Sequence, residues 1–215
     1  GAASGAAASA RGTKPLHPRG AVVPARIERT GAGGTWDVPW LDDAGDDAAV
    51  VRLSRAMGLP DSLPDVLGLA VRFTDETGRH DLLLATTGMA PVARHLLIPR
   101  MQPLATPYSS LFPYVTPRGR ALIAAAPDGP PGGFTLLVAG MTSDWQPFGT
   151  LRLSDDPATS EDDPIDFDPV CNPLPGMRLA PALAALREPA YAAARRMRRP
   201  EPTGATERTG ATARR

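Results

Sequence analysis

Seven short apolar segments, each bounded by turn-forming residues, constrain the fold of this chain more than any other feature. They are rich in Val, Leu, Ile or Phe, and clusters of Gly, Pro, Asp or Thr separate them, which is typical of β-strands. The segments cover residues 21–30, 49–54, 68–74, 80–86, 121–126, 134–141 and 150–154. Many short strands at such spacing predict a sheet that closes into a barrel or folds into a sandwich.

Two of the connections carry hairpin signals. Asp75-Glu76-Thr77-Gly78 separates the third and fourth segments, and the Pro- and Gly-rich run 127–133 separates the fifth and sixth. Most of the 25 prolines also lie in connections, where a missing N–H group costs no ladder hydrogen bond. The connections therefore favour antiparallel neighbours.

Two segments have helical spacing instead. We expect a short helix over residues 92–97. A longer helix is expected over residues 179–199, where apolar residues recur every three or four positions, namely Leu179, Leu183, Leu186, Ala190, Ala194 and Met197. Pro189 disfavours helical geometry at Glu188, so either this helix kinks or a second helix begins with Pro189 at its first position.

The chain has 215 residues, a size typical of a single domain. Residues 1–13 and 200–215 lack apolar periodicity, and the second of these stretches has no large hydrophobic residue. We expect both ends to be disordered, on either side of one domain over residues 14–199.

Charge and cysteine content argue against several classes of protein. The chain has 23 basic and 23 acidic residues, so no basic excess favours a nucleic-acid or anionic-membrane partner. Its single cysteine, Cys171, forms no internal disulfide, which is compatible with a reducing compartment. Because the sequence has neither a signal-peptide pattern nor an apolar run of membrane-spanning length, we expect a soluble cytoplasmic protein.

Arg187 and Tyr191 form the most restrictive pair of residues in the chain. Residues four apart on a helix share a face, so the guanidinium can approach the phenol. A phenol binds iron poorly until it loses its proton, and an adjacent permanent positive charge favours the phenolate. Taken alone, the pair fits two interpretations: a tyrosine packed on the barrel with the arginine stem across its ring, or a phenolate ligand for ferric haem, which is the catalase arrangement.

A segment near the start supports the second interpretation. In the catalase family, a His-x-Lys-Gly run precedes the first barrel strand. Here the corresponding run Leu16-His17-Pro18-Arg19-Gly20-Ala21-Val22 resembles it and is also followed by a strand pattern. A distal histidine takes a proton from peroxide and returns it to the leaving oxygen, which requires a pKa near the working pH.

Segments in the middle of the chain extend the resemblance. Family members have an Arg-Phe-Ser strand, an Asp-x-x-Gly loop, a Gly-Phe-Ala-Val-Lys-Phe strand and a Gly-Asn-x-Asp-Leu segment, in that order. The same order here gives Val51-Arg52-Leu53-Ser54, then Asp65-Val66-Leu67-Gly68-Leu69-Ala70-Val71-Arg72-Phe73, then Gly78-Arg79-His80-Asp81-Leu82. The chain is thus similar to short catalase-related proteins that keep mainly the barrel, and the resemblance covers residues 14–199.

The resemblance implies an α+β fold with a closed antiparallel β-barrel of about eight strands and a few helices. It implies haem (ferric protoporphyrin) as the cofactor, His17 as the distal base and Tyr191 as the iron ligand. Four arginines are implied around the cofactor: Arg187 beside the phenolate, Arg52 on one propionate, Arg198 on the other side, and Arg195 as a weaker candidate. Arginines near the two carboxylates are what a buried porphyrin edge needs.

The sequence also departs from the family pattern. The distal asparagine that orients peroxide is expected shortly after Asp81-Leu82, but this chain has Ala85-Thr86-Thr87. Thr86 is the candidate replacement, because its hydroxyl still donates a hydrogen bond, although no amide is present. The phenylalanines that cover the haem in the family are absent from residues 91–97. These losses favour weaker disproportionation of hydrogen peroxide.

The expected function is therefore haem-dependent peroxide chemistry of the catalase or peroxidase kind. A peroxide is the expected substrate, with a second peroxide or a small organic molecule as the electron donor, and neither nucleic acid nor a membrane as a partner. The oligomeric state stays open. Two alternatives remain: a non-enzymatic haem-binding or haem-sensing barrel, and a haem-free barrel that acts as a scaffold or binding module.

Overall fold

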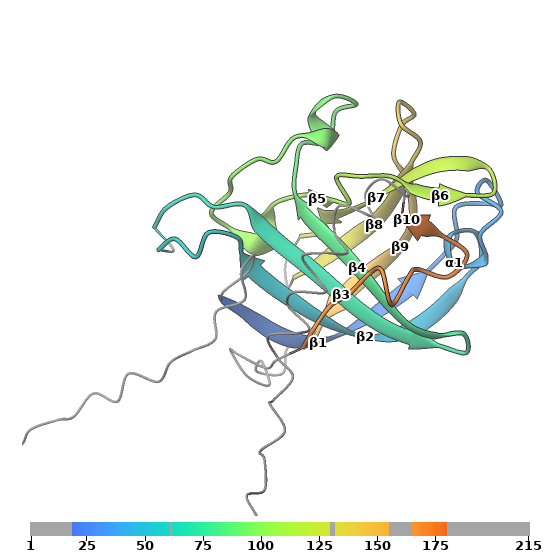
Figure 1. The fold of residues 1–215 in the computed structure, drawn as a ribbon, viewed down its shortest axis with the longest axis horizontal. Coiled ribbons are helices and arrows are strands. Elements are labelled where there is room, and N and C mark those ends of the chain that lie inside the picture. Colours follow the sequence, from blue (N-terminus) through green and yellow to red (C-terminus); the bar gives the residue numbers. More distant parts are fainter. Residues whose placement is uncertain (1–18, 61, 130–131, 155–164, 180–215) are drawn as a thin grey trace, which may run out of the picture.

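The computed structural model describes residues 19–60, 62–129, 132–154 and 165–179. In chain order the elements are β1 (Arg19–Arg29), α1 (Pro39–Asp42), β2 (Gly45–Arg55), β3 (Leu67–Asp75), β4 (Gly78–Thr86), η1 (Ala93–His95), η2 (Pro103–Ala105), β5 (Tyr108–Ser109), β6 (Tyr114–Thr116), β7 (Gly119–Pro127), β8 (Gly133–Ala139), β9 (Gln146–Leu153) and β10 (Arg178–Leu179). Figure 1 shows these strands curving around a common interior, with the two 3-10 helices in the connections.

Eight strands close into one antiparallel barrel. Following the hydrogen-bonded neighbours gives the order β1-β2-β3-β4-β5-β7-β8-β9, and β9 pairs again with β1 to complete the ring. Strands β6 and β10 form a short ladder on β7. A closed ring leaves no unpaired sheet edge, which is how all-β architectures avoid edge-to-edge association. The predicted fold class is confirmed.

The core fills the inside of the ring. Alternate residues of each strand point inward, so Val51 on β2 and Leu69, Val71 and Phe73 on β3 join one cluster of buried apolar side chains. The indole ring of Trp40, from α1, stacks on the ring of Phe73 with centroids 5.0 Å apart and closes one end of the barrel. Burial of these large side chains is the main source of stability.

The tight turn between β3 and β4 follows from its sequence. Asp75 pairs with Gly78, and the carboxylate of Asp75 accepts hydrogen bonds from the backbone N–H groups of Thr77 (2.7 Å) and Gly78 (3.2 Å). An aspartate that binds the backbone two residues ahead nucleates such turns. Both predicted hairpins, this one and the one between β7 and β8, are present.

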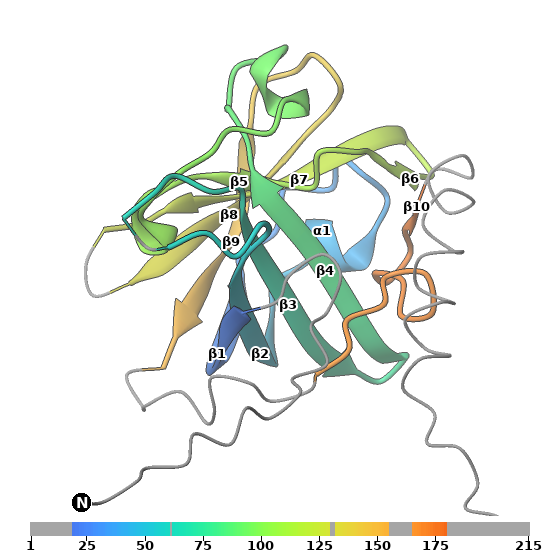
Figure 2. The same cartoon turned by 60° about the vertical axis from the view of Figure 1, so that its left-hand side comes forward.

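Residues 165–179, which we call the C-terminal strap, complete the barrel wall where it is weakest. Strands β4 and β5 share only two residue pairs. The strap lies beside the rest of β4, as Figure 2 shows, and the backbone N–H of Asp81 donates to the carbonyl oxygen of Asn172 at 2.9 Å. Leu174 and Met177 of the strap belong to the core, so the strap is part of the barrel rather than an appendage.

The elements predicted from the sequence agree with the structure except in two places, and α1, β5, β6 and β10 were not predicted. All seven predicted strands are present, with bounds extended or shifted by a few residues. The expected helix over residues 92–97 is one 3-10 turn, η1. The expected start of the long helix at Leu179 is wrong, because Leu179 pairs with Tyr114 of β6 as part of β10. The rest of that helix and both chain ends lie outside the described residues.

Candidate functional site: the outer face of the barrel wall

Several side chains on the outer face of β1, β2 and β3 are buried although they point away from the core. Val22, Arg52 and Ala70 are register partners on neighbouring strands and are 1%, 7% and 8% exposed. Val22 and Ala70 do not belong to the interior cluster, which confirms their outward direction. This face of the wall therefore carries a buried cation between small apolar residues.

A second row of small residues lies beside the first. By strand pairing, Ser54 faces Gly68, Gly68 faces Ala85, and Ala85 faces Ser109. Together with Arg52, Ala70 and Leu83, these residues form what we call the outer patch: Arg52, Ala70, Leu83, Ser54, Gly68, Ala85 and Ser109. Arg52 and Ser54 each have an interaction partner. The second row has only short side chains, whereas the first row also contains Leu83 and Arg52, and Arg52 supplies the one permanent charge of the patch.

Polar networks border the outer patch on two sides. On one side, Arg72 of β3 forms a bidentate ion pair with Asp81 of β4, at 2.7 and 2.8 Å. On the other side, the Thr87 hydroxyl donates to Ser109 Oγ at 2.9 Å, and Ser109 Oγ donates to the carbonyl oxygen of Arg94 at 3.0 Å. The first network anchors the C-terminal strap, and the second anchors the loop that contains η1.

Thr86, the candidate replacement for a distal amide, lies on the other side of the wall. It is fully buried, and its Oγ1 accepts a hydrogen bond from the backbone N–H of Leu67 at 3.1 Å. Its register partner Tyr108 belongs to the interior cluster, whereas Ala85 lies on the outer patch. The structure therefore places Thr86 and Arg52 on opposite faces of the wall. Successive side chains of a strand point to opposite faces, and this alternation was the sequence signal that could have assigned Thr86 and Ala85 to different faces.

The other predicted site residues, His17, Arg187, Tyr191, Arg195 and Arg198, lie outside the described residues. Among the residues that the structure describes, no group of three or more His, Cys, Asp or Glu side chains could hold a metal ion. In the same part of the chain, no helix is long and apolar enough to cross a membrane. Arg52 is thus the one predicted cofactor contact whose surroundings are described.

Sequence reasoning missed a second buried arginine, Arg94, which is 1% exposed. Its Nη1 donates to the carbonyl oxygens of Gly140 (3.0 Å) and Ser143 (3.1 Å), and its guanidinium lies 4.5 Å from the centroid of the Trp145 ring. Burial lowers the pKa of Arg94 from its ordinary value. Because these partners come from the loop after β8, Arg94 fastens the η1 loop to that loop, and Figure 2 shows the two loops together at the top of the barrel.

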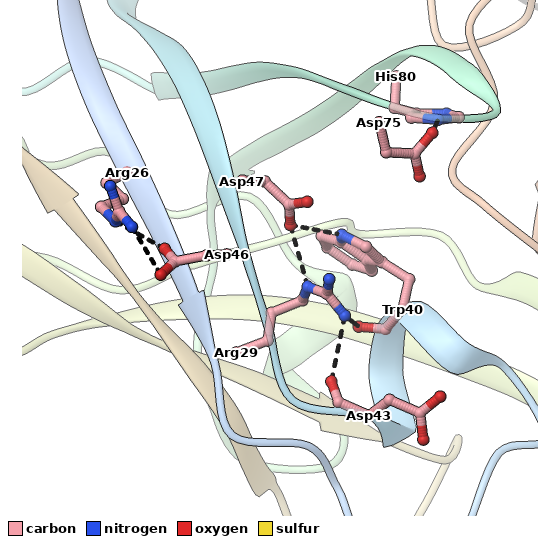
Figure 3. A network of polar contacts seen from close by, with 8 residues as sticks. All are labelled: Arg26, Arg29, Trp40, Asp43, Asp46, Asp47, Asp75 and His80. Atoms are coloured by element: carbon pink, nitrogen blue, oxygen red, sulfur yellow. Dashed lines mark hydrogen bonds and ion pairs between the residues drawn. The ribbon is translucent and has the colours of Figure 1, made fainter.

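A polar pair inside the barrel closes the β3–β4 hairpin. His80 Nε2 contacts the Asp75 carboxylate at 2.8 Å (Figure 3), and His80 Nδ1 contacts the carbonyl oxygen of Pro173 at 2.6 Å. Burial acts to raise the pKa of Asp75, but hydrogen bonds from Thr77 and His80 outweigh it and lower that pKa to about 2. This pair is a structural contact to the strap and lies away from the outer patch.

The fold and the outer patch thus define the class of protein: a closed eight-stranded antiparallel barrel whose outer face carries a buried arginine. No protein-family model matches the chain, and a search of curated proteins finds no match. Solved structures of catalases do match the fold. A fungal catalase superimposes with a TM-score of 0.66 at 13% identity, over 86% of this chain and 59% of its own.

Two further catalases give the same result. A bacterial catalase matches with a TM-score of 0.62 at 14% identity, over 86% of this chain and 57% of its own. Catalase A from Saccharomyces cerevisiae matches with a TM-score of 0.62 at 12% identity, over 86% of this chain and 60% of its own. The protein therefore has a catalase-like fold, and it spans less than two thirds of the length of these catalases.

Proposed function

We propose that this protein is a haem-dependent, peroxide-using oxidoreductase of the catalase or peroxidase kind. The observation that carries the proposal is Arg52, a buried guanidinium on the outer face of a catalase-like barrel, set among small side chains. A guanidinium is suited to a haem propionate, because its planar donors match a carboxylate. The row of small residues beside it, Ser54, Gly68, Ala85 and Ser109, also suits the flat face of a porphyrin. The described residues therefore fit the cofactor.

In this proposal the remaining contacts come from the sequence motifs. Tyr191, with Arg187 beside it, is the phenolate ligand of the iron, while Arg198 and Arg195 hold the cofactor's other edge. His17, three residues before Gly20, takes a proton from the peroxide and returns it to the leaving oxygen. Gly20, which follows His17 by three positions in the sequence, pairs with Ser54 of the outer patch.

When bound, the haem supplies a redox-active iron at which the peroxide O–O bond is cleaved. Each peroxide that is reduced to two waters consumes two electrons and two protons. A second peroxide, which leaves as oxygen, or a small organic donor provides them. The protein's own part is to hold the cofactor, place the phenolate and move the proton at His17.

A non-enzymatic haem-binding or haem-sensing protein is the second candidate, and Ala85 favours it. This residue lies on the outer patch and has no hydrogen-bond donor in its side chain, so it cannot orient a peroxide. Oxygen release from hydrogen peroxide, compared between wild type and a His17→Ala variant, separates the two candidates. An enzyme depends strongly on that imidazole, whereas a carrier or sensor releases no oxygen in either form.

Titration of the purified chain with hemin tests the proposal itself. We expect a Soret band whose intensity saturates at one hemin per chain, charge-transfer bands that change in Tyr191→Phe, and weaker binding in Arg52→Ala. The Asp46→Asn variant, at an exposed ion pair on the same strand, is the matched control and should bind hemin like wild type. Absence of a Soret band after hemin is supplied would support a haem-free scaffold or binding module instead.

A further inference from the structure

Asp81 is the centre of a buried hydrogen-bond network between the barrel wall and the C-terminal strap. It is fully buried, and its carboxylate accepts four hydrogen bonds. Two come from Arg72, one from the backbone N–H of Asp168 at 2.7 Å, and one from Asn172 Nδ2 at 2.8 Å. Hydrogen bonds to an ionised carboxylate are about twice as strong as neutral ones, so this network is a strong local anchor.

Arg72 extends the network to the start of the strap. Its Nη2 donates to the carbonyl oxygen of Asp166, and its guanidinium lies 4.9 Å from the centroid of the Phe167 ring. Asp81 and Arg72 thus hold residues 166–172 from two sides. A strap segment held by this many contacts to one ion pair has little freedom while the pair is intact.

The anchored part of the strap lies next to the outer patch. Arg72 and Asp81 are register partners on the outer face, and the next outward pair along the same two strands is Ala70 and Leu83, which belong to the outer patch. Successive residues on one face of a strand are about 7 Å apart. The Arg72 row, with the strap fixed to it, is therefore the immediate border of the surface that carries Arg52.

We propose that Asp81 is a positioning residue for the cofactor surface. Through Asp168 and Asn172 it fixes the strap along one border of the outer patch, and so sets the boundary against which a planar group on the patch is held. This inference rests on the proposed haem function. It adds to the site a residue to which the sequence alone gave no role. Asp81 acts through the strap and lies one row of side chains away from the outer patch.

Asn172→Ala is the sharpest test, because it removes one strap contact and leaves the Arg72–Asp81 ion pair intact. Asp81→Asn is a second and more disruptive variant, because it also removes the negative charge that Arg72 faces. Both are made in the full chain. Hydrogen exchange of the apoprotein reports the Asp168 amide, and hemin titration at a temperature well below the unfolding midpoint reports affinity.

We expect faster exchange at Asp168 in both variants. Hemin binding in Asn172→Ala should weaken by up to about tenfold, because the free energy of one hydrogen bond to a charged group is the most that a loosened strap can remove from binding. A merely structural contact lowers the unfolding midpoint but leaves the hemin affinity of the folded protein unchanged. Asp46→Asn, which breaks an exposed pair with the same bidentate geometry, should alter neither readout.

The outcomes separate this inference from the proposed function. Faster exchange at Asp168 with unchanged hemin affinity would show that Asp81 does not position the cofactor surface, while the haem function stands. Unchanged exchange at Asp168 would show that the network does not anchor the strap. Failure of the wild-type chain to bind hemin would overturn the proposed function and, with it, the positioning role.

Discussion

Asp47 and Trp40 meet inside the end of the barrel, where the indole Nε1 donates to the Asp47 carboxylate at 3.2 Å. The same carboxylate oxygen accepts from Arg29 Nε at 2.9 Å, and both charged side chains are largely buried. Its neighbour Asp46 points instead to Arg26, as Figure 3 shows, and this second pair is exposed. Two adjacent aspartates on one strand therefore form the same kind of ion pair in opposite environments.

We expect Asp47→Asn to lower the free energy of unfolding by about 3–5 kcal/mol, because it leaves the Arg29 charge buried without its anionic partner. Asp46→Asn is the matched control and should leave the urea midpoint nearly unchanged, since exposed pairs contribute little. Urea unfolding followed by Trp fluorescence and circular dichroism measures both. Equal effects of the two substitutions would contradict the assigned burial.

Gly31 and Gly33 give a test of backbone packing in the connection between β1 and α1. Both have positive φ, +82° and +76°, so replacement by Ala costs about 1–2 kcal/mol at either position. Only at Gly31 would the added Cβ also collide with the backbone carbonyl oxygen of Asp42, whereas nothing lies within 4 Å at Gly33. Thermal unfolding should therefore show a larger loss for Gly31→Ala than for Gly33→Ala, and a reversed order would exclude this account.

The strands of the barrel were predictable from the sequence because they are local patterns, whereas these patterns left a barrel and a sandwich open and only the resemblance to catalases implied the closed barrel. Short apolar segments and the turn Asp75–Gly78 specify strands and hairpins without reference to distant residues. The two-residue strand β5 was missed because Tyr108 and Ser109 are too few to form a pattern. Leu179 was expected in a helix because its spacing fits one, but its pairing with Tyr114 is a long-range contact that spacing does not encode.

The candidate site was predictable only in part, for a related reason. Arg52 stood out because a strand motif surrounds it. The network of Asp81 with Asn172 joins residues 91 positions apart, and no local pattern reveals such a contact. Thr86 was chosen for its hydroxyl, but the alternation of side chains along β4 decides which face a residue serves, and it assigns Ala85 to the outer patch.

Thr86 should matter for stability through one hydrogen bond. Thr86→Val keeps the shape but leaves the buried N–H of Leu67 without an acceptor, which costs about 1–3 kcal/mol. Thr86→Ser keeps the acceptor and loses one methyl group, which costs about 1 kcal/mol. We expect valine to be the more destabilising residue in urea unfolding. If serine were as damaging as valine, packing of the methyl group and not the hydrogen bond would be the main contribution.

Asp75 should give the protein a defined sensitivity to acid. Its folded-state pKa of about 2 lies below its ordinary value of 3.8, so the ionised form stabilises the fold. The shift corresponds to about 2 kcal/mol, which is fully present above about pH 4 and is lost as the pH falls toward 2. Asp75→Asn should be less stable than wild type at neutral pH and should lose less stability between pH 4 and pH 2. Parallel stability curves over that range would contradict the assignment to Asp75.

Ala85 offers a gain-of-function test of the proposed chemistry. Because Ala85 lies on the outer patch between Gly68 and Ser109, an asparagine there places an amide donor on the same face as Arg52. If the proposed function holds, Ala85→Asn loaded with hemin should release oxygen from hydrogen peroxide faster than wild type, because the added amide supplies a donor that can orient the peroxide on the face that carries Arg52. Ala85→Leu is the control for added bulk without a donor and should not increase the rate. If both variants lose hemin equally, the position is too close to the cofactor for any larger side chain, and the peroxide does not approach from this part of the patch.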